Sequence, residues 1–160
     1  MTPGVPEARH TLQQGGGILG GSGLAWEAGP VTSPHLVLVV DDQAPFRAAA
    51  KAVLRRLAGF DLAGEASSGP EAIELVGKLH PALVLMDINM PGMSGIEATR
   101  QVVSAHPDVV VILCSTYDAA DLPADAATSG AAGYVHKERF GADLLRRLWA
   151  NRDSGWFVDR

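Results

Sequence analysis

The sequence predicts an α/β fold in which five parallel strands alternate with five helices that cover both faces of a doubly wound sheet. From residue 35 onward, short apolar runs of strand length alternate with longer stretches in which apolar residues recur every three or four positions. Strands that alternate with helices pair in parallel, because each crossover returns the chain to the same edge of the sheet.

The expected strands are five apolar runs, of which the second is the least apolar. They lie at residues 36–40, 60–66, 82–86, 109–114 and 132–136. The expected helices follow the strands in order, at residues 44–57, 70–80, 95–106, 119–130 and 140–151. The fourth, AADLPADAATSG, has Pro123 early in it, so we expect this helix to be short or mobile.

Two joints between helix and strand support this division. LHP (79–81) and AHP (105–107) each place a histidine in the last turn of a helix and a proline just beyond it. A histidine favours the negative end of a helix, and a proline prevents its continuation. We therefore interpret His80 and His106 as helix-end residues and not as metal ligands.

The chain of 160 residues suggests one domain with some length to spare. Residues 1–34 are rich in Gly, Pro, Ser and Gln and are predicted to be a flexible extension. Residues 35–152 are predicted to form the folded domain, and residues 153–160 a C-terminal tail. The single cysteine, Cys114, lies in the apolar run VVVILC and is interpreted as a core side chain.

Charge and hydropathy exclude several classes of partner. A net charge of −5 argues against a broad binding surface for nucleic acid. No apolar run approaches the length that crosses a bilayer, and the glycine-broken N-terminus is a poor secretory signal. We therefore expect a cytoplasmic protein that binds neither nucleic acid nor membrane through these residues.

Polar side chains stand where four of the expected strands end, which is where open parallel sheets place their sites. In chain order they are Asp41, Asp42, Asp87, Ser115, Thr116 and Lys137. Taken singly, Asp42 also reads as a helix cap and Asp87 as a turn residue. Three carboxylates on one rim would repel each other unless a cation held them, and Mg²⁺ is a hard ion that suits them.

With these motifs and their spacing, residues 36 to about 151 resemble a bacterial response-regulator receiver domain of the CheY-like kind. The segments STYD and GAAGYVHKE look like the receivers of the helix-turn-helix DNA-binding group. The resemblance implies a flavodoxin-like (βα)5 fold with the sheet order 2-1-3-4-5. It also implies that Asp87 is the phosphoacceptor. Mg²⁺ would be bound by Asp42, Asp87 and the backbone carbonyl of Asn89, with Asp41 acting through water.

The same resemblance assigns Ser115 and Lys137 to stabilising the phosphoryl group, and Ser115 with Tyr134 to the switch. Three carboxylates, Mg²⁺ and Lys137 sum to zero charge, and an aspartyl phosphate adds roughly one negative charge. The Ser115 hydroxyl is the nearest new donor, and its movement would open space for Tyr134 to rotate into. We expect a new surface to form on the face of residues 119–130, 132–136 and 140–151.

Three functions compete. The first is a phosphorylation-controlled switch that is fed by a histidine kinase or a phosphotransfer protein and catalyses only its own phosphorylation and dephosphorylation. The second is the receiver part of a transcription regulator, whose DNA-binding module would not fit in the closing RDSGWFVDR. The third is a hydrolase with Asp87 as nucleophile, which the asparagine at position 89 disfavours, because such enzymes use an acid there.

The end of the sequence is unusually aromatic. Trp149, Trp156 and Phe157 exceed what one short helix usually buries, and exposed aromatic residues tend to mark a contact surface. We therefore expect phosphorylation to strengthen a homodimer, or partner binding, through the face of the last two helices.

Overall fold

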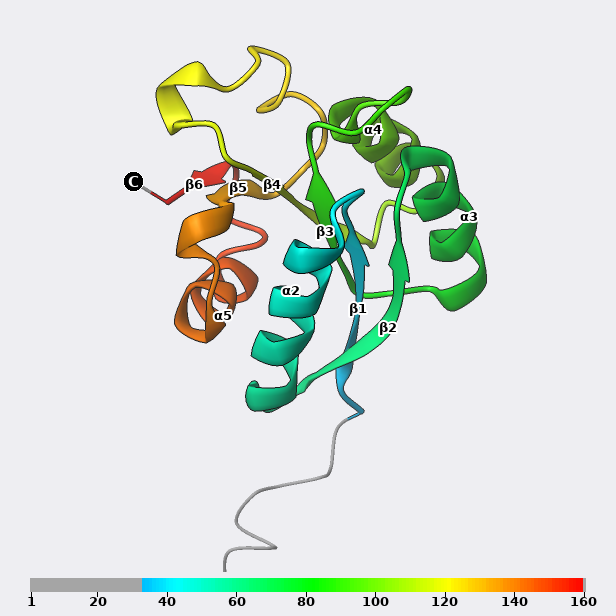
Figure 1. Cartoon of the computed structure of the whole chain (residues 1–160), viewed down its shortest axis with the longest axis vertical. Coiled ribbons are helices and arrows are strands. Elements are labelled where there is room, and N and C mark those ends of the chain that lie inside the picture. Colours follow the sequence, from blue (N-terminus) through cyan, green and yellow to red (C-terminus); the bar gives the residue numbers. More distant parts are fainter. Residues whose placement is uncertain (1–32, 160) are drawn as a thin grey trace, which may run out of the picture. The chain divides into compact units, whose positions relative to one another are not determined.

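The computed structural model describes residues 33–159, which form one compact unit. Its centre is a parallel sheet of six strands in the order β2-β1-β3-β4-β5-β6 (Figure 1). The first five strands have the order 2-1-3-4-5 that the sequence predicts, and a sixth strand is added at the β5 edge. All but the last two residues of the predicted extension 1–34 lie outside the described residues.

The strands occupy nearly the positions expected from the sequence. They are β1 (His35–Val40), β2 (Phe60–Ala66), β3 (Leu83–Asp87), β4 (Val110–Ser115), β5 (Gly133–His136) and β6 (Phe157–Val158). Every residue of β3 is buried, as in a strand that is covered on both faces. Cys114 in β4 is a fully buried free thiol, which confirms its interpretation as a core side chain.

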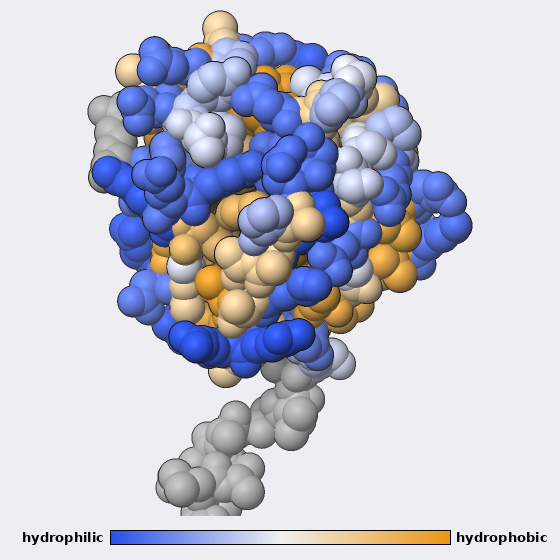
Figure 2. Space-filling view, in the orientation of Figure 1, coloured by the Kyte–Doolittle hydropathy of each residue, from blue (hydrophilic) through white to orange (hydrophobic). Residues whose placement is uncertain are grey.

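Four α-helices cover the two faces of the sheet (Figure 1). They are α2 (Ala44–Arg56), α3 (Gly69–Leu79), α4 (Gly95–Ala105) and α5 (Ala142–Ala150). Helices α2 and α5 pack on one face, and α3 and α4 on the other, each pair over its own apolar cluster. The surface seen in Figure 2 is largely hydrophilic, with a smaller apolar area near its centre. No helix within residues 33–159 is long and apolar enough to cross a membrane.

Local signals in the sequence set the ends of α3 and α4. Each begins after a serine whose side chain accepts a hydrogen bond from the backbone N–H of a glutamate three residues later. Each ends at the histidine expected there. His80 is in the left-handed region with φ 47°, and its backbone N–H donates to the carbonyl of Val76. His106 donates in the same way to Val102.

The predicted helix at 119–130 does not form. Residues 116–132 are all described, and they contain a single 3-10 turn, η1 (Ala119–Asp121). Pro123 has no backbone N–H to donate, and short polar side chains take backbone acceptors instead: the Ser129 hydroxyl donates to the carbonyl of Ala126 at 2.7 Å. An irregular segment therefore covers this part of the sheet.

Residues 153–160, predicted to be a C-terminal tail, include strand β6 (Phe157–Val158). The backbone N–H of Phe157 donates to the carbonyl of Ala132 at 3.0 Å. The three aromatic residues expected to be exposed, Trp149, Trp156 and Phe157, are half-buried. Trp149 packs on the rings of His35 and Phe60, at centroid distances of 4.5 and 5.6 Å. These aromatic side chains are therefore less exposed than expected, because they pack on the folded unit.

Gly95 is the point at which α4 meets the end of β3, and a side chain there cannot be accommodated. An added Cβ would lie 1.8 Å from the carbonyl oxygen of Asp87. We expect Gly95→Ala to lower the free energy of unfolding by about 3 kcal/mol or more, because backbone must move to relieve the overlap. Urea unfolding followed by circular dichroism measures this change.

Gly77→Ala is the matched control, because an added Cβ at Gly77 in α3 meets nothing within 4 Å. This control should be at least as stable as the unmodified chain, since alanine favours a helix interior over glycine. Equal stability of Gly95→Ala and Gly77→Ala would contradict the close approach of α4 to β3.

Candidate functional site

Three carboxylates meet beyond the carboxyl ends of the two central strands. Asp41 and Asp42 follow β1, and Asp87 is the last residue of its neighbour β3. One oxygen from each of the three lies within 4.8 Å of the others. Asp41 is fully buried, Asp87 is 2% exposed and Asp42 is half-buried. The structure thus brings together the three acids that the sequence predicts to share one rim.

Lys137 brings a positive charge to this cluster. It begins the 3-10 turn η2 (Lys137–Arg139) directly after β5. Its Nζ lies 2.6 Å from Oδ2 of Asp41 and 3.1 Å from Oδ1 of Asp87. The ammonium also lies 5.1 Å from the centre of the Phe46 ring. Within residues 33–159, Lys137 is the one cationic side chain that pairs with these acids, so one positive charge faces three carboxylates.

The oxygen atoms of this cluster fit a hard divalent cation. Oδ2 of Asp41 is a buried side-chain oxygen that makes no hydrogen bond within the described residues, although the Lys137 ammonium is beside it. Asp42 does not cap α2: the capping position is Gln43, which makes no side-chain cap. The Asp42 carboxylate accepts a hydrogen bond only from the Gln43 side chain, at 3.3 Å, within this part of the chain. A site of several carboxylates with unused lone pairs suits Mg²⁺.

Burial and crowding shift the ionisation of the site. Burial, the charge of Asp41 and the nearby Asp42 carboxylate raise the pKa of Asp87 to about 6, although Lys137 opposes them. Burial by itself lowers the pKa of Lys137. The attraction of Asp41 and Asp87 outweighs that effect and raises the pKa above its ordinary value. Lys137 therefore stays charged, while the Asp87 carboxyl group resists ionisation.

Ser115 and Tyr134 lie side by side beneath the site. Both are 1% exposed, and the Ser115 Oγ is 2.9 Å from the Tyr134 hydroxyl. Ser115 Oγ also accepts from the backbone N–H of Tyr117 at 3.0 Å. The Tyr134 hydroxyl is within hydrogen-bond reach of the carbonyls of Ser115 and Tyr117. The ring of Tyr134 thus already occupies the inward position that the sequence analysis expects it to reach by rotation.

Sequence reasoning missed Tyr117, which lies over the rim of the site. Its hydroxyl donates to the side-chain oxygen of Asn89 at 3.3 Å. Asn89 stands two residues after Asp87, and Tyr117 stands two residues after Ser115, on the neighbouring strand. Asp87 pairs with Cys114, so Asn89 and Tyr117 stand two and three residues beyond one pair of adjacent parallel strands. These similar offsets are the signal that could have identified the contact, because such residues leave the sheet side by side.

The fold and this arrangement define a receiver domain. Residues 37–148 match the family model described as the response regulator receiver domain, and the chain belongs to that family. It is therefore the receiver domain of a two-component response regulator, as the resemblance implied. Response regulators obtain their phosphoryl group from histidine kinases, and receiver domains bind Mg²⁺ in an acidic pocket.

Its relatives include a transcriptional regulatory protein and other response regulators. The chain is 37% identical over 122 residues to the transcriptional regulatory protein DegU of Brevibacillus brevis, a match that covers 76% of this chain and 52% of DegU. It is 38% identical over 116 residues to the response regulator GacA of Pseudomonas viridiflava, covering 72% and 53%. The chain thus spans about half the length of the curated relatives it matches.

Among solved structures, the receiver domain of the putative response regulator NarL from Mycobacterium tuberculosis superimposes with a TM-score of 0.69 at 28% identity. That match covers 76% of this chain and 98% of the NarL domain. A two-component regulator of the LuxR family from Aurantimonas gives the same TM-score at 27% identity, covering 78% and 90%. Both confirm the predicted fold.

The raised pKa of Asp87 gives a pH-dependent stability in the absence of divalent cations. A carboxyl group whose pKa rises from 3.8 to about 6 on folding stabilises the fold below pH 4 and loses that contribution as the pH rises through about 6. We therefore expect Asp87→Asn to raise the melting temperature by a few degrees at pH 8, and by progressively less as the pH falls toward 4.

Calorimetry in a chelator from pH 4 to pH 8 tests this expectation. Asp61→Asn, which removes an exposed carboxylate from β2, controls for the general loss of a negative charge. A gain in melting temperature that is the same at pH 4 and pH 8, or a loss at pH 8, would contradict the assigned crowding.

Proposed function

We propose that this protein is a phosphorylation-controlled signalling switch that accepts a phosphoryl group on Asp87 from a histidine kinase or a phosphotransfer protein. The observation that carries the proposal is the shared ion pair: the ammonium of Lys137 contacts both Asp41 and Asp87, at 2.6 and 3.1 Å. A carboxylate that ends a buried strand and faces a fixed cation is suited to receive an anionic group. We place this switch in the cytoplasm, the usual location of such regulators.

We further propose that Mg²⁺ is held by the carboxylates of Asp42 and Asp87 and by the backbone carbonyl of Asn89, with Asp41 acting through water. The support is the donor set, which offers the oxygen ligands that this ion prefers. Bound there, Mg²⁺ neutralises charge on the oxygens of the transferring phosphoryl group.

The chemistry of Asp87 follows from its surroundings. An ionised oxygen of Asp87 attacks the phosphorus atom as the bond to the donor breaks, and an acyl phosphate is formed. Asp87 must be ionised to attack, and the attraction of Lys137 favours that form. Because no carboxylic acid stands at position 89, we propose that this chain catalyses only its own phosphorylation and dephosphorylation.

The added negative charge reorganises the residues beneath the site. The Ser115 hydroxyl has one proton to donate, and in this structure its close partner is the Tyr134 hydroxyl at 2.9 Å. On phosphorylation the Ser115 hydroxyl donates its hydrogen bond to a phosphoryl oxygen instead. The Tyr134 hydroxyl keeps its hydrogen bond to the carbonyl of Tyr117. The change passes to the segment after β4 and to β5, where we propose that it favours a homodimer or a partner.

A second function is favoured by the comparisons. The relatives include a transcriptional regulator, and this chain spans about half its length. We propose as an alternative that residues 33–159 are the receiver part of a DNA-binding regulator. In that case the DNA contacts belong to an output domain, and not to the receiver described here.

Phosphorylation at Asp87 can be tested directly with a small acyl phosphate as donor in the presence of Mg²⁺. We expect one hydroxylamine-sensitive phosphoryl group per chain, found on Asp87 by mass spectrometry, and none in Asp87→Asn. The reason is that the amide cannot form an acyl phosphate.

The Asp61→Asn variant serves as the control and should be labelled like the unmodified chain, since Asp61 lies on β2 and is exposed. Undiminished labelling of Asp87→Asn would refute the assignment of the phosphoacceptor.

A further inference from the structure

The C-terminal strand β6 is attached to the edge of β5 through backbone and not through a large interface. Two residues pair in parallel register, Phe157 with Gly133 and Val158 with Tyr134. The close approach depends on Gly133 having no side chain, because an added Cβ would lie 2.5 Å from the carbonyl oxygen of Phe157. The sequence at this edge of β5 is therefore adapted to accept β6.

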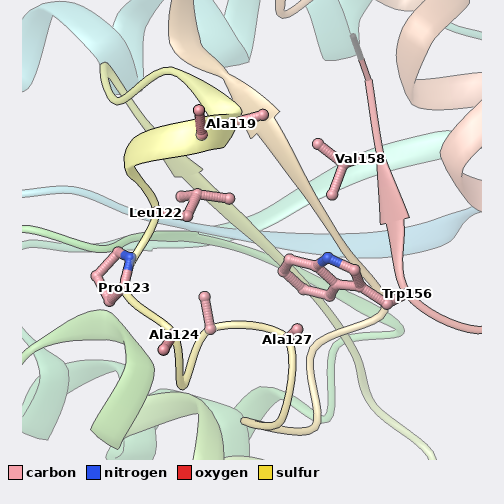
Figure 3. Close-up of a pocket in the computed structure, with 9 residues that line it drawn as sticks. Ala119, Leu122, Pro123, Ala124, Ala127, Trp156 and Val158 are labelled. Carbon is pink, nitrogen blue, oxygen red and sulfur yellow. The ribbon is translucent and has the colours of Figure 1, made fainter.

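Strand β6 covers Tyr134. With an irregular segment in place of a helix between β4 and β5, the apolar cover on this side comes from Leu122, Trp156 and Val158, which pack on the cluster that contains Tyr134. In Figure 3 the side chains of Trp156 and Val158 point toward Leu122 across a pocket. The residues after α5 thus help to keep the Tyr134 ring away from water.

A second contact joins β6 to the turn that carries Lys137. Asp159 directly follows β6, and its side chain is 15% exposed. Its carboxylate lies 3.2 Å from the Arg147 guanidinium of α5 and 3.6 Å from that of Arg139. Arg139 is the last residue of η2, which begins at Lys137. The end of β6 is therefore tied, through one short turn, to the cation of the site.

We propose that β6 is a positioning element of the phosphorylation switch: while attached to β5 it holds Tyr134 inward and steadies the turn of Lys137, and it thereby favours phosphorylation of Asp87. This inference rests on the proposed function of Asp87. If attached β6 raises the equilibrium constant for phosphorylation of Asp87, thermodynamic reciprocity requires that phosphorylation strengthens the attachment of β6 by the same factor.

The direction of the coupling follows from the hydrogen bonds of Ser115. When its hydroxyl turns to the phosphoryl group, Tyr134 keeps its carbonyl partners, its pairing with Val158 of β6, and its place in the cluster that Trp156 also covers. Without β6, β5 would be an edge strand and Tyr134 would lose that cover. A pocket of about 540 Å³ lies beside Trp156 and Val158, next to this cover.

The test compares Gly133→Ala with Gly77→Ala in the full chain. The three atoms nearest to an added Cβ at Gly133 all belong to Phe157. An added Cβ at Gly77 meets nothing within 4 Å. We expect Gly133→Ala to lower the equilibrium ratio of phosphorylated to unphosphorylated chain, with a small acyl phosphate as donor, at least about fivefold, the lower end of typical couplings. The affinity of Gly133→Ala for Mg²⁺ should stay within about twofold of that of Gly77→Ala. The three carboxylates lie at the ends of β1 and β3, so a weak coupling between them and β6 changes the Kd for Mg²⁺ little.

A second readout reports Tyr134 itself. In a Tyr117→Phe background, Tyr134 is the remaining tyrosine, so its ionisation is visible by ultraviolet absorbance. Burial raises the pKa of Tyr134 above 10, and Gly133→Ala should bring this pKa down toward 10. Hydrogen exchange at the Phe157 amide should slow when the unmodified chain is phosphorylated. A purely structural role of β6 would not produce this phosphorylation-dependent protection.

If Gly133→Ala fails to fold, Asp159→Asn replaces it, with Asp153→Asn as control, since the Asp153 side chain is 90% exposed and 3.9 Å from Arg152. Asp159→Asn should lower the equilibrium ratio of phosphorylated to unphosphorylated chain as well, and Asp153→Asn should not. If a variant's Phe157 amide exchanges freely and the variant is still phosphorylated normally, the role of β6 is refuted and the proposed function is not. Absence of phosphorylation in the unmodified chain would instead overturn the proposed function.

Discussion

The contact of one ammonium with two buried carboxylates is the interaction on which the rest of this structure depends. Asp41 and Asp87 are almost completely buried, so when both are ionised they place two negative charges in the interior. Lys137 lies within 3.1 Å of both, which makes the pair tolerable, but a buried ion pair rarely adds net stability because desolvation offsets the attraction. The cluster is better understood as a site held ready for further charge than as a stabilising element.

The surrounding fold serves to hold these three side chains at one point. Strands β1 and β3 are neighbours in a parallel sheet, so their carboxyl ends deliver Asp41, Asp42 and Asp87 to the same edge. Lys137 approaches from β5, two strands beyond β3, and reaches the acids with its long side chain. Gly95 lets α4 begin directly against the backbone of Asp87, which limits how far that carboxylate can move.

Much of this could be predicted from the sequence, because local patterns carry it. The apolar runs predicted the five strands, the two histidines marked the ends of α3 and α4, and acids after strands indicated a site at one edge. Asp42 as a cap was a reasonable alternative until Gln43 was found at the capping position.

Other features depend on contacts distant in sequence. In residues 119–130 the alanines favour a helix and Pro123 disfavours one. The structure has irregular backbone there, apart from the 3-10 turn η1. Strand β6 has only two residues, too short for periodicity to detect, and it exists because Gly133 leaves space for it. The inward position of Tyr134 likewise reflects packing between β5 and residues near the end of the chain.

Calorimetric titration of Mg²⁺ into the full chain, and into Asp42→Ala, tests the central claim that these carboxylates form a cation site balanced by Lys137. Asp42 is half-buried, and its carboxylate accepts one hydrogen bond, from the Gln43 side chain. Its replacement by alanine should therefore leave the fold intact and remove a direct ligand of Mg²⁺. We expect a single Mg²⁺ site in the unmodified chain and an affinity at least about tenfold weaker in Asp42→Ala. Equal affinities in the two proteins would contradict it.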